Sequence, residues 1–243
     1  PVTLGIIQAT YGGGTAFSGS QFPCDATFTK FNASGTAAVY ATYFGGADND
    51  QPHSIIVDKL DQLCIAGRTY SNNFPTSANA YDNSYNGGAD MFIAKFSSNG
   101  TVLVGSTYIG GSADDGVNEA ALEFQSGILK HNYADDARSE IIYDANNNVY
   151  IAGCTQSIDF PITPNAFQSN NAGAQDGIII QLNNDCSSLL WGTYAGGAQN
   201  DAAYVLSINK SNPNELFVAG GTISANYPTT AGAHLPSYQG GQT

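Results

Sequence analysis

Basic residues are scarce in this chain of 243 residues: 7 Lys and Arg stand against 20 Asp and Glu, and the formal net charge is −13. So acidic a surface repels nucleic acid and anionic membranes, and neither is an expected partner. Long apolar runs are missing as well, because no stretch approaches the roughly 18 apolar residues that span a bilayer. Disorder is not expected, since 42% of the residues are hydrophobic and can build a core.

Cysteine is rare too, and its spacing matches no metal motif. The four cysteines form no Cys-x-x-Cys pair and have no histidines at zinc-ligand spacing. Cys64 lies in a strand-like apolar run, which favours a buried free thiol, while a disulfide framework with three alternative pairings stays open. The chain also lacks a Gly-x-Ser-x-Gly nucleophile motif and a P-loop, so the commonest hydrolase and nucleotide-binding signatures are absent.

Glycine is abundant, with 28 residues, and four strand-like runs recur along the chain in a fixed order. The runs lie at 25–31, 90–96 and 176–182; at 41–46, 106–111 and 192–197; at 55–58, 141–144 and 206–209; and at 63–67, 149–153 and 216–220. A longer connection containing an aromatic-Pro pair closes each unit, at Phe74-Pro75, Phe160-Pro161 and Tyr227-Pro228. Such self-similarity is typical of repeat architectures.

The recurring runs are rich in β-formers and several lack alternation, as Gly177-Ile-Ile-Ile shows. Near-continuous apolar strands imply burial on both faces of the sheet. Four-stranded sheets packed face to face around an axis meet this demand and protect their edges. We therefore predict an all-β chain made of β-propeller blades with four antiparallel strands each; a linear solenoid is the alternative.

The repeated motifs carry a family resemblance. The pattern Asp-x-Phe-x-x-Lys-Phe, Ser-Thr-Tyr-x-Gly-Gly, Tyr-Ile-Ala-Gly and Phe-Pro-x-Thr resembles the bacterial β-propeller repeat, often called the seven-bladed propeller repeat, over nearly the whole chain. The resemblance implies a large secreted or cell-surface protein, often from gliding bacteria and often ending in a type IX secretion sorting domain.

The repeats divide the chain into a connection at 1–24 and units at 25–89, 90–175 and 176–243. If the Ile55–Asp58 run is innermost, the chain holds two complete blades, preceded by an outer half-blade and followed by an inner half-blade. Joining the halves would close a ring of three blades, below the usual minimum of about four. We therefore expect a part of a larger propeller, or a chain that needs further copies to complete the ring.

Long connections are expected at two places in each blade, after the Gly-Gly run and after the Ala-Gly run. Both would lie on the same face of an antiparallel blade, and insertions on one face commonly mark the binding face.

Acidic residues follow every Gly-Gly pair and are candidate calcium ligands, namely Asp48, Asp50, Asp114, Asp115 and Asp201. Calcium prefers six to eight oxygen ligands. An aspartate after a tight glycine turn also hydrogen-bonds backbone amides, and recurrence in every repeat favours this structural role.

The segment from Gly116 to Glu140 is the one stretch that the repeat does not explain. Its candidate ligand-binding residues are His131, Tyr133, Asp135, Asp136, Arg138 and Glu140. Three interpretations stay open: a solvated elaboration of the surface, a recognition loop, and a carboxylate pair for glycoside hydrolysis.

Aromatic or imidazole side chains recur after the aromatic-Pro pairs, at Tyr81, Phe167 and His234. They could stack on sugars, but their matched positions favour plugs between neighbouring blades.

The leading functional prediction is a non-catalytic extracellular module of a bacterial surface or secreted protein, serving as scaffold, adhesin or recognition domain. Its expected partner is a protein or polysaccharide at the cell surface, bound through the long-loop face. No cofactor is established by the sequence, and calcium is the one candidate. Two alternatives are kept: a carbohydrate-active enzyme that uses carboxylates of residues 114–140, and a self-assembling structural protein.

Overall fold

The computed structural model describes residues 3, 5–13, 24–118 and 139–240, and all regular elements in these ranges are β-strands. The strands are β1 (Ala26–Phe31), β2 (Ala38–Phe44), β3 (Asp50–Val57), β4 (Leu63–Thr69), β5 (Asp90–Phe96), β6 (Leu103–Ile109), β7 (Glu140–Tyr143), β8 (Val149–Thr155), β9 (Asp176–Leu182), β10 (Leu189–Ala195), β11 (Asp201–Ile208) and β12 (Leu216–Thr222). Within the described ranges, no helix has the length and apolar character needed to cross a membrane.

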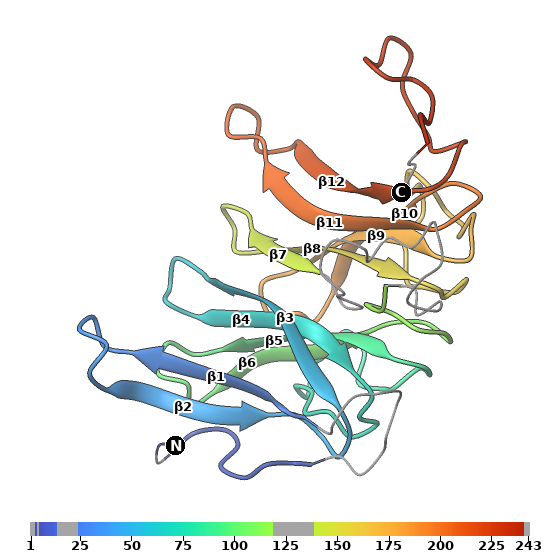
Figure 1. The fold of residues 1–243 in the computed structure, drawn as a ribbon. Coiled ribbons are helices and arrows are strands. Elements are labelled where there is room, and N and C mark those ends of the chain that lie inside the picture. The colour runs from blue at the N-terminus through green and yellow to red at the C-terminus, as the bar shows by residue number, and fades with distance from the viewer. Residues whose placement is uncertain (1–2, 4, 14–23, 119–138, 241–243) are drawn as a thin grey trace.

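The strands form four antiparallel sheets that follow one another along the chain (Figure 1). Two sheets have four strands in chain order, β3 to β6 and β7 to β10, and two have only a pair, β1–β2 and β11–β12. This confirms the predicted fold class, with two complete blades between an outer and an inner half-blade. In the described part of the chain the two half-blades do not pair with each other, so no closed ring is seen.

The innermost strands are the first ones of the blades, since β7 contacts both β3 and β11. The third strands, β5 and β9, are buried along their whole length because they have a core on each side. In β5, Met91 and Ile93 belong to the core shared with the following blade, whereas Phe92 and Phe96 belong to the core shared with the preceding half-blade. The period of two along a strand thus serves two cores, as the near-continuous apolar runs predicted.

Two long connections were predicted in each blade, and the prediction is wrong for the connection after the Gly-Gly run, which is short. Only residues 45–49 separate β2 from β3, and only 196–200 separate β10 from β11. The reason is that the polar segment after the glycines already belongs to the innermost strand, which starts at Asp50 in β3 and at Asp201 in β11.

The insertion interrupts the innermost strand of the second complete blade and is not a connection between blades. Asp115 still pairs with Thr155, as Asp50 pairs with Thr69, but regular pairing resumes only at Glu140. In β3 and β11 the corresponding stretch has a register shift, at Pro52/Ser54 and Ala203/Val205. The extra residues therefore enter at the position where the innermost strands β3 and β11 are bulged, a position that accepts added chain without breaking the sheet.

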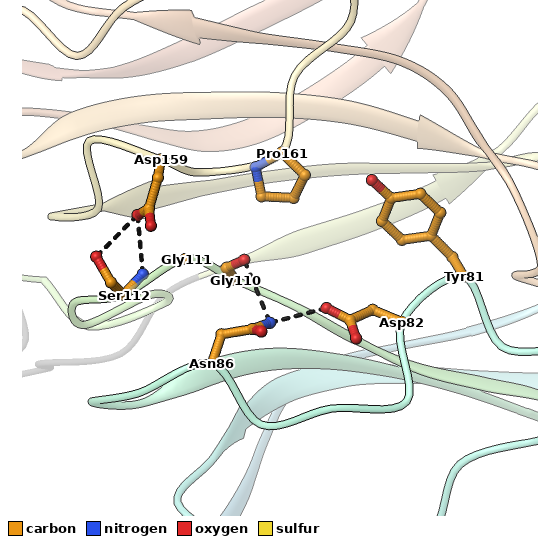
Figure 2. A pocket seen from close by; sticks show the side chains of 8 residues that line it. All are labelled: Tyr81, Asp82, Asn86, Gly110, Gly111, Ser112, Asp159 and Pro161. Carbon is orange, nitrogen blue, oxygen red and sulfur yellow. Dashed lines mark hydrogen bonds between the residues drawn. The ribbon is translucent and has the colours of Figure 1, made fainter.

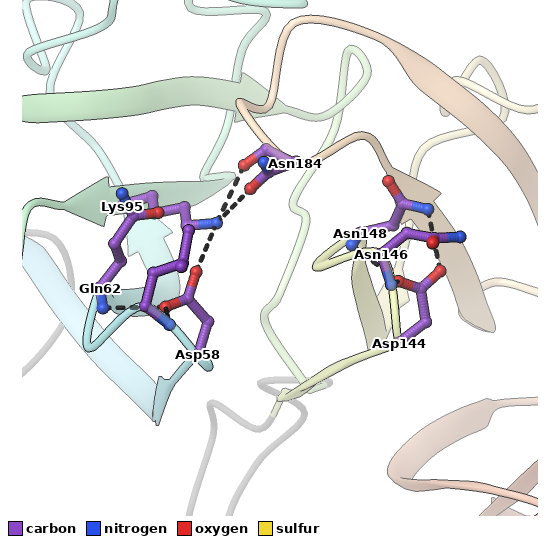
Figure 3. A network of polar contacts seen from close by, with 8 residues as sticks. Asp58, Gln62, Lys95, Asp144, Asn146, Asn148 and Asn184 are labelled. Atoms are coloured by element: carbon purple, nitrogen blue, oxygen red, sulfur yellow. Dashed lines mark hydrogen bonds and ion pairs between the residues drawn. The ribbon is translucent and has the colours of Figure 1, made fainter.

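Lys95 on β5 ties its own blade to the next one (Figure 3). Its Nζ lies 3.0 Å from Asp58 Oδ2, donates to the Asn184 carbonyl oxygen at 3.2 Å, and donates to Asn184 Oδ1 at 2.5 Å. In the next blade Gln181 occupies the matching place and donates to Asp144 at 3.2 Å. A polar contact between the third strand and the first hairpin is therefore a repeated part of the blade.

The four cysteines are all free thiols, so none of the three possible disulfide pairings occurs. Burial raises the pKa of Cys64 to about 11 and that of Cys154 to about 12, which keeps these thiols neutral. They act as small apolar core groups, as expected for Cys64.

Candidate functional site

The two ends of the blades differ in their connections. Tight hairpins such as β3–β4 and β5–β6 lie at one end, while the opposite end carries the long connections 70–89 and 156–175 together with the Gly-Gly turns. We call this second end the loop face. Because antiparallel strands alternate in direction, the starts of β3 and β5 and the ends of β4 and β6 meet there.

A buried aspartate opens the innermost strand of every blade on the loop face. Asp50 accepts hydrogen bonds from the Gly46 N–H at 2.7 Å, the Thr69 hydroxyl at 2.5 Å and the Ser71 hydroxyl at 3.0 Å. The same partners recur around Asp115, from Gly111, Thr155 and Ser157, and around Asp201, from Gly197 and Ser224. Each aspartate therefore fastens a Gly-Gly turn to the end of the second strand.

A second buried aspartate, at the start of the third strand, faces the first across a glycine. A Cβ at Gly110 would lie 2.2 Å from Asp90 Oδ1 and 2.9 Å from Asp115 Oδ2, and Gly45 and Gly196 have similar surroundings. Burial raises the pKa of both Asp90 and Asp115 to about 7, and the mutual repulsion of the two carboxylates adds to the shift of Asp90. This explains why the first glycine recurs: no side chain fits between the paired carboxyl groups.

The predicted calcium ligands are all placed by this network. Asp48 accepts from the Asn49 N–H at 2.8 Å, and Asp114 from the Ala89 N–H at 2.8 Å, so both also cap backbone groups. In the described ranges, no group of three or more His, Cys, Asp or Glu side chains is arranged to hold a metal ion. The carboxylates thus have the structural role that recurrence favoured, and calcium binding stays a prediction.

The candidate ligand residues of the insertion are divided by the limits of the described chain. His131, Tyr133, Asp135, Asp136 and Arg138 lie outside it. Glu140 lies inside, at the start of β7, where its carboxylate accepts the Leu206 N–H of the neighbouring half-blade at 2.5 Å. Glu140 therefore joins two innermost strands.

The prediction that aromatic or imidazole side chains plug the space between blades is wrong for Tyr81, the one that lies between two complete blades. For Phe167 and His234 it stays a prediction, because no complete blade follows them among the described strands. Tyr81 is 37% exposed, Phe167 is 73% exposed, and His234 is exposed as well. The side chains buried between the sheets are instead Phe74 and Phe160 of the aromatic-Pro pairs. The repeat analysis identified these pairs but did not predict that their phenylalanines are buried.

A tyrosine of the fourth strand, β6 or β10, holds each of these phenylalanines in place. The Tyr108 hydroxyl accepts the Phe74 N–H at 2.8 Å and donates to the Ser71 carbonyl at 2.7 Å. Tyr194 forms the matching pair of bonds with the Phe160 N–H and the Ser157 carbonyl, both at 3.0 Å. The tyrosine of the Ser-Thr-Tyr motif therefore fixes the backbone of the Phe-Pro motif, and we call this pair of hydrogen bonds the Tyr-Phe corner.

A pocket with a volume of about 350 Å³ opens on the loop face between the two complete blades (Figure 2). Its lining comes from the β4–β5 connection, the turn after β6 and the β8–β9 connection, namely Tyr81, Asp82, Asn86, Gly110, Gly111, Ser112, Asp159 and Pro161. Figure 2 shows Tyr81 and Asp82 on one side and Asp159 with Ser112 on the other. Among the described residues, this is a concave site where polar groups of two blades converge. The sequence analysis did not predict it.

The sheets, the corner motifs and the repeated aspartate network together define a protein built of β-propeller blades. A family model described as SBBP, a beta-propeller repeat, matches residues 39–75, from β2 through β4 to the Phe-Pro corner. The chain thus carries a repeat of a β-propeller family, as its motifs predicted. A search of curated proteins gave no match.

Proposed function

We propose that this chain is a non-catalytic propeller module of a bacterial surface or secreted protein, and that it recognises a polysaccharide through its loop face. The observation that carries the proposal is a difference between two sets of carboxylates on this face. The recurring buried aspartates hydrogen-bond the Gly-Gly turns, whereas Asp82 and Asp159 line the pocket between the blades. This is the division expected of a rigid scaffold that offers a binding surface.

The test combines binding and turnover on the same substrates. The chain is run by native electrophoresis through gels containing dextran, yeast mannan or xylan, and the same polysaccharides are assayed for released reducing ends. We expect retardation in at least one gel and no release. Release of reducing ends would favour the carbohydrate-active enzyme, and the absence of both effects on all three polymers would contradict polysaccharide recognition.

A second candidate, self-assembly, is favoured by the edge of β12. This strand carries Leu-Phe-Val-Ala-Gly where β4 carries Leu-Cys-Ile-Ala-Gly, yet Phe217 and Val218 are 62% and 41% exposed while Cys64 and Ile65 are 0% and 2% exposed. Cys64 packs in the core shared with the following blade and Ile65 in the core shared with the preceding half-blade. Phe217 and Val218 belong to none of the described core clusters, and β12 pairs only with β11 in the described chain. A further groove of about 330 Å³ runs beside the same strand.

The occupant that fits this edge is β1 of a second copy. β1 is the counterpart of β5, and its partner among the described strands is β2 alone. The register follows from the complete blade, where Leu63 pairs with Phe96; the equivalent pair is Leu216 with Phe31. Pairing through an open edge adds both a hydrogen-bond ladder and apolar burial.

Self-assembly is tested by light scattering over a range of concentrations. We expect a mass that rises with concentration, and a return to the monomer mass in Phe217→Lys, which places a charge where an apolar contact is needed. Leu190→Lys, an exposed leucine on β10 of a complete blade, is the matched control. A constant mass of 25.3 kDa at all concentrations would contradict this candidate.

A further inference from the structure

The pocket between the two complete blades is lined by a residue that departs from the repeat. In each repeat, a threonine hydroxyl of the outermost strand (β2, β6 or β10) donates a hydrogen bond to one backbone carbonyl of the long connection. The accepting carbonyls belong to Gln8 (from Thr42), Asp82 (from Thr107) and Gln168 (from Thr193). The three carbonyls are therefore equivalent, and only the middle repeat has an aspartate there.

Where the residue is glutamine, its side chain fills the space at the end of the blade. Gln168 accepts the Gly196 N–H at 2.9 Å and donates to Asp176 Oδ2 at 2.7 Å, so it bridges the Gly-Gly turn and the buried carboxylate. Gln8 forms the same bridge, with Gly45 at 3.0 Å and Asp25 at 3.3 Å.

Asp82 cannot form this bridge, because a carboxylate donates no hydrogen bond and would repel the buried Asp90. Its side chain instead accepts from the Ser84 N–H at 2.9 Å and the Asn86 Nδ2 at 2.8 Å. In place of the glutamine bridge, the Asn86 amide donates to Asp82 and, at 3.5 Å, to the Gly110 carbonyl, and the pocket opens beside these groups (Figure 2).

The chemistry of the lining indicates what fits this space. Tyr81 supplies a half-exposed aromatic ring and Pro161 a second apolar surface. Asp159 uses Oδ1 to accept the Ser112 N–H at 2.9 Å and its hydroxyl at 3.0 Å, which leaves Oδ2 free to accept from a ligand. The backbone hydrogen bond from Ser112 lowers the pKa of Asp159, so this carboxylate is ionised at neutral pH.

An acceptor-rich pocket beside an aromatic face suits a ligand with several hydroxyl donors and one apolar side, which is the chemistry of a pyranose ring. No Lys or Arg lines the pocket, and Asp82 and Asp159 repel anions, so acidic sugars are disfavoured. The volume of about 350 Å³ lies at the small end of ligand sites and suits one or two rings.

We propose that the pocket formed by Tyr81, Asp82 and Asp159 binds a neutral pyranose ring, with Tyr81 against the ring and Asp159 accepting from its hydroxyls. This rests on the proposed polysaccharide recognition and names the place and the sugar class.

The probes for the test are the methyl glycosides of glucose, galactose, mannose and N-acetylglucosamine, titrated into the 243-residue chain. Binding is followed through the backbone amide shifts of Gly110, Gly111 and Ser112 in NMR spectra. We expect at least one glycoside to shift these amides saturably, with a Kd of roughly 1–10 mM. The proposal is overturned if none of the four glycosides shifts these amides. A shift by butylammonium in that case would show that the acidic pocket binds an organic cation instead of a sugar.

Asp82→Gln is the decisive variant, because glutamine is the native residue of the other two repeats and should close the pocket without harming the fold. We expect it to weaken glycoside binding at least about tenfold while the unfolding temperature stays the same or rises. Tyr81→Ala should weaken binding similarly. Phe167→Ala is the control, since Phe167 matches Tyr81 beside a site that Gln168 fills, and it should change nothing.

Equal glycoside affinity in the wild type and in Asp82→Gln would overturn the pocket proposal. If a polysaccharide retards both proteins equally in the gel, polysaccharide recognition stands and only its assignment to this pocket is wrong.

Discussion

Replacing Lys95 by methionine should destabilise the chain strongly, because it leaves a buried charge without its counter-ion. The side chains of Lys95 and Asp58 are both 0% exposed, and Nζ lies 3.0 Å from Oδ2 (Figure 3). Asp58 Oδ1 keeps the N–H bonds from Leu60 at 2.8 Å and Gln62 at 2.9 Å, but Oδ2 loses its cation. Removing one partner of a buried pair costs about 3–5 kcal/mol, and the retained bonds favour the lower end, about 3 kcal/mol.

Urea unfolding followed by far-UV circular dichroism measures this loss. With a denaturant slope of about 3 kcal/mol per M, the midpoint should fall by about 1 M. Lys95→Gln should lose less, because Gln181 donates to Asp144 at the matching place of the next blade. Lys30→Met is the control: Lys30 is exposed and donates to the Ser98 carbonyl, so a loss under about 0.5 kcal/mol is expected. Equal effects of Lys95→Met and Lys30→Met would refute the reasoning.

Three further predictions concern the loop face. Burial raises the pKa of Asp90 and Asp115 to about 7, so the folded chain binds more protons than the unfolded chain between about pH 4 and 7. The free energy of unfolding should therefore fall as the pH rises through this range. An unfolding temperature at pH 8 that equals or exceeds the one at pH 5 would contradict this. Gly110→Ala forces a Cβ between these two carboxyl groups and should cost about 2 kcal/mol or more in urea unfolding, while a cost under about 0.5 kcal/mol would show that the space is not tight. Tyr108→Phe removes the acceptor of a buried N–H and should cost about 2 kcal/mol, against little change for the partly exposed equivalent Tyr43→Phe; similar losses in both would exclude the corner role.

The strands and their grouping into blades were predictable because the motifs recur with the same order in every unit. The start of the innermost strand was not. Asp50-Gln51-Pro52-His53 is polar and contains a proline, which predicts a loop. It is a strand because β4 offers seven residues for pairing, and the register shift at Pro52/Ser54 accommodates the proline.

The aspartate network was predictable only in part. Recurrence marked Asp50, Asp115 and Asp201 as structural, but not their partners. A signal was present in Thr69-x-Ser71, Thr155-x-Ser157 and Thr222-x-Ser224. Both hydroxyls of the first two pairs, and that of Ser224 in the third, donate to the carboxylates. Their distance in sequence from the aspartates hid the link, because antiparallel pairing of two strands brings the groups together.

The pocket could not be predicted from the sequence, because recognising it requires the side-chain contacts that the equivalent glutamines make in the other two repeats. The repeat aligns Asp82 with Gln8 and Gln168, but only the geometry shows that glutamine bridges a turn and a carboxylate. The exposure of Phe167 was missed for a related reason. The Tyr81 N–H reaches the Cys186 carbonyl of the β9–β10 hairpin, and the half-blade beyond Phe167 has no such hairpin among its described strands.

The most direct test of the account is amide hydrogen exchange of the chain with and without a polysaccharide that retards it. Ligand recognition by the loop face predicts slower exchange in residues 70–89, 110–112 and 156–175, with no change in the hairpins at 58–62, 97–102 and 183–188. Protection confined to the hairpins, or spread evenly over both ends of the blades, would contradict it.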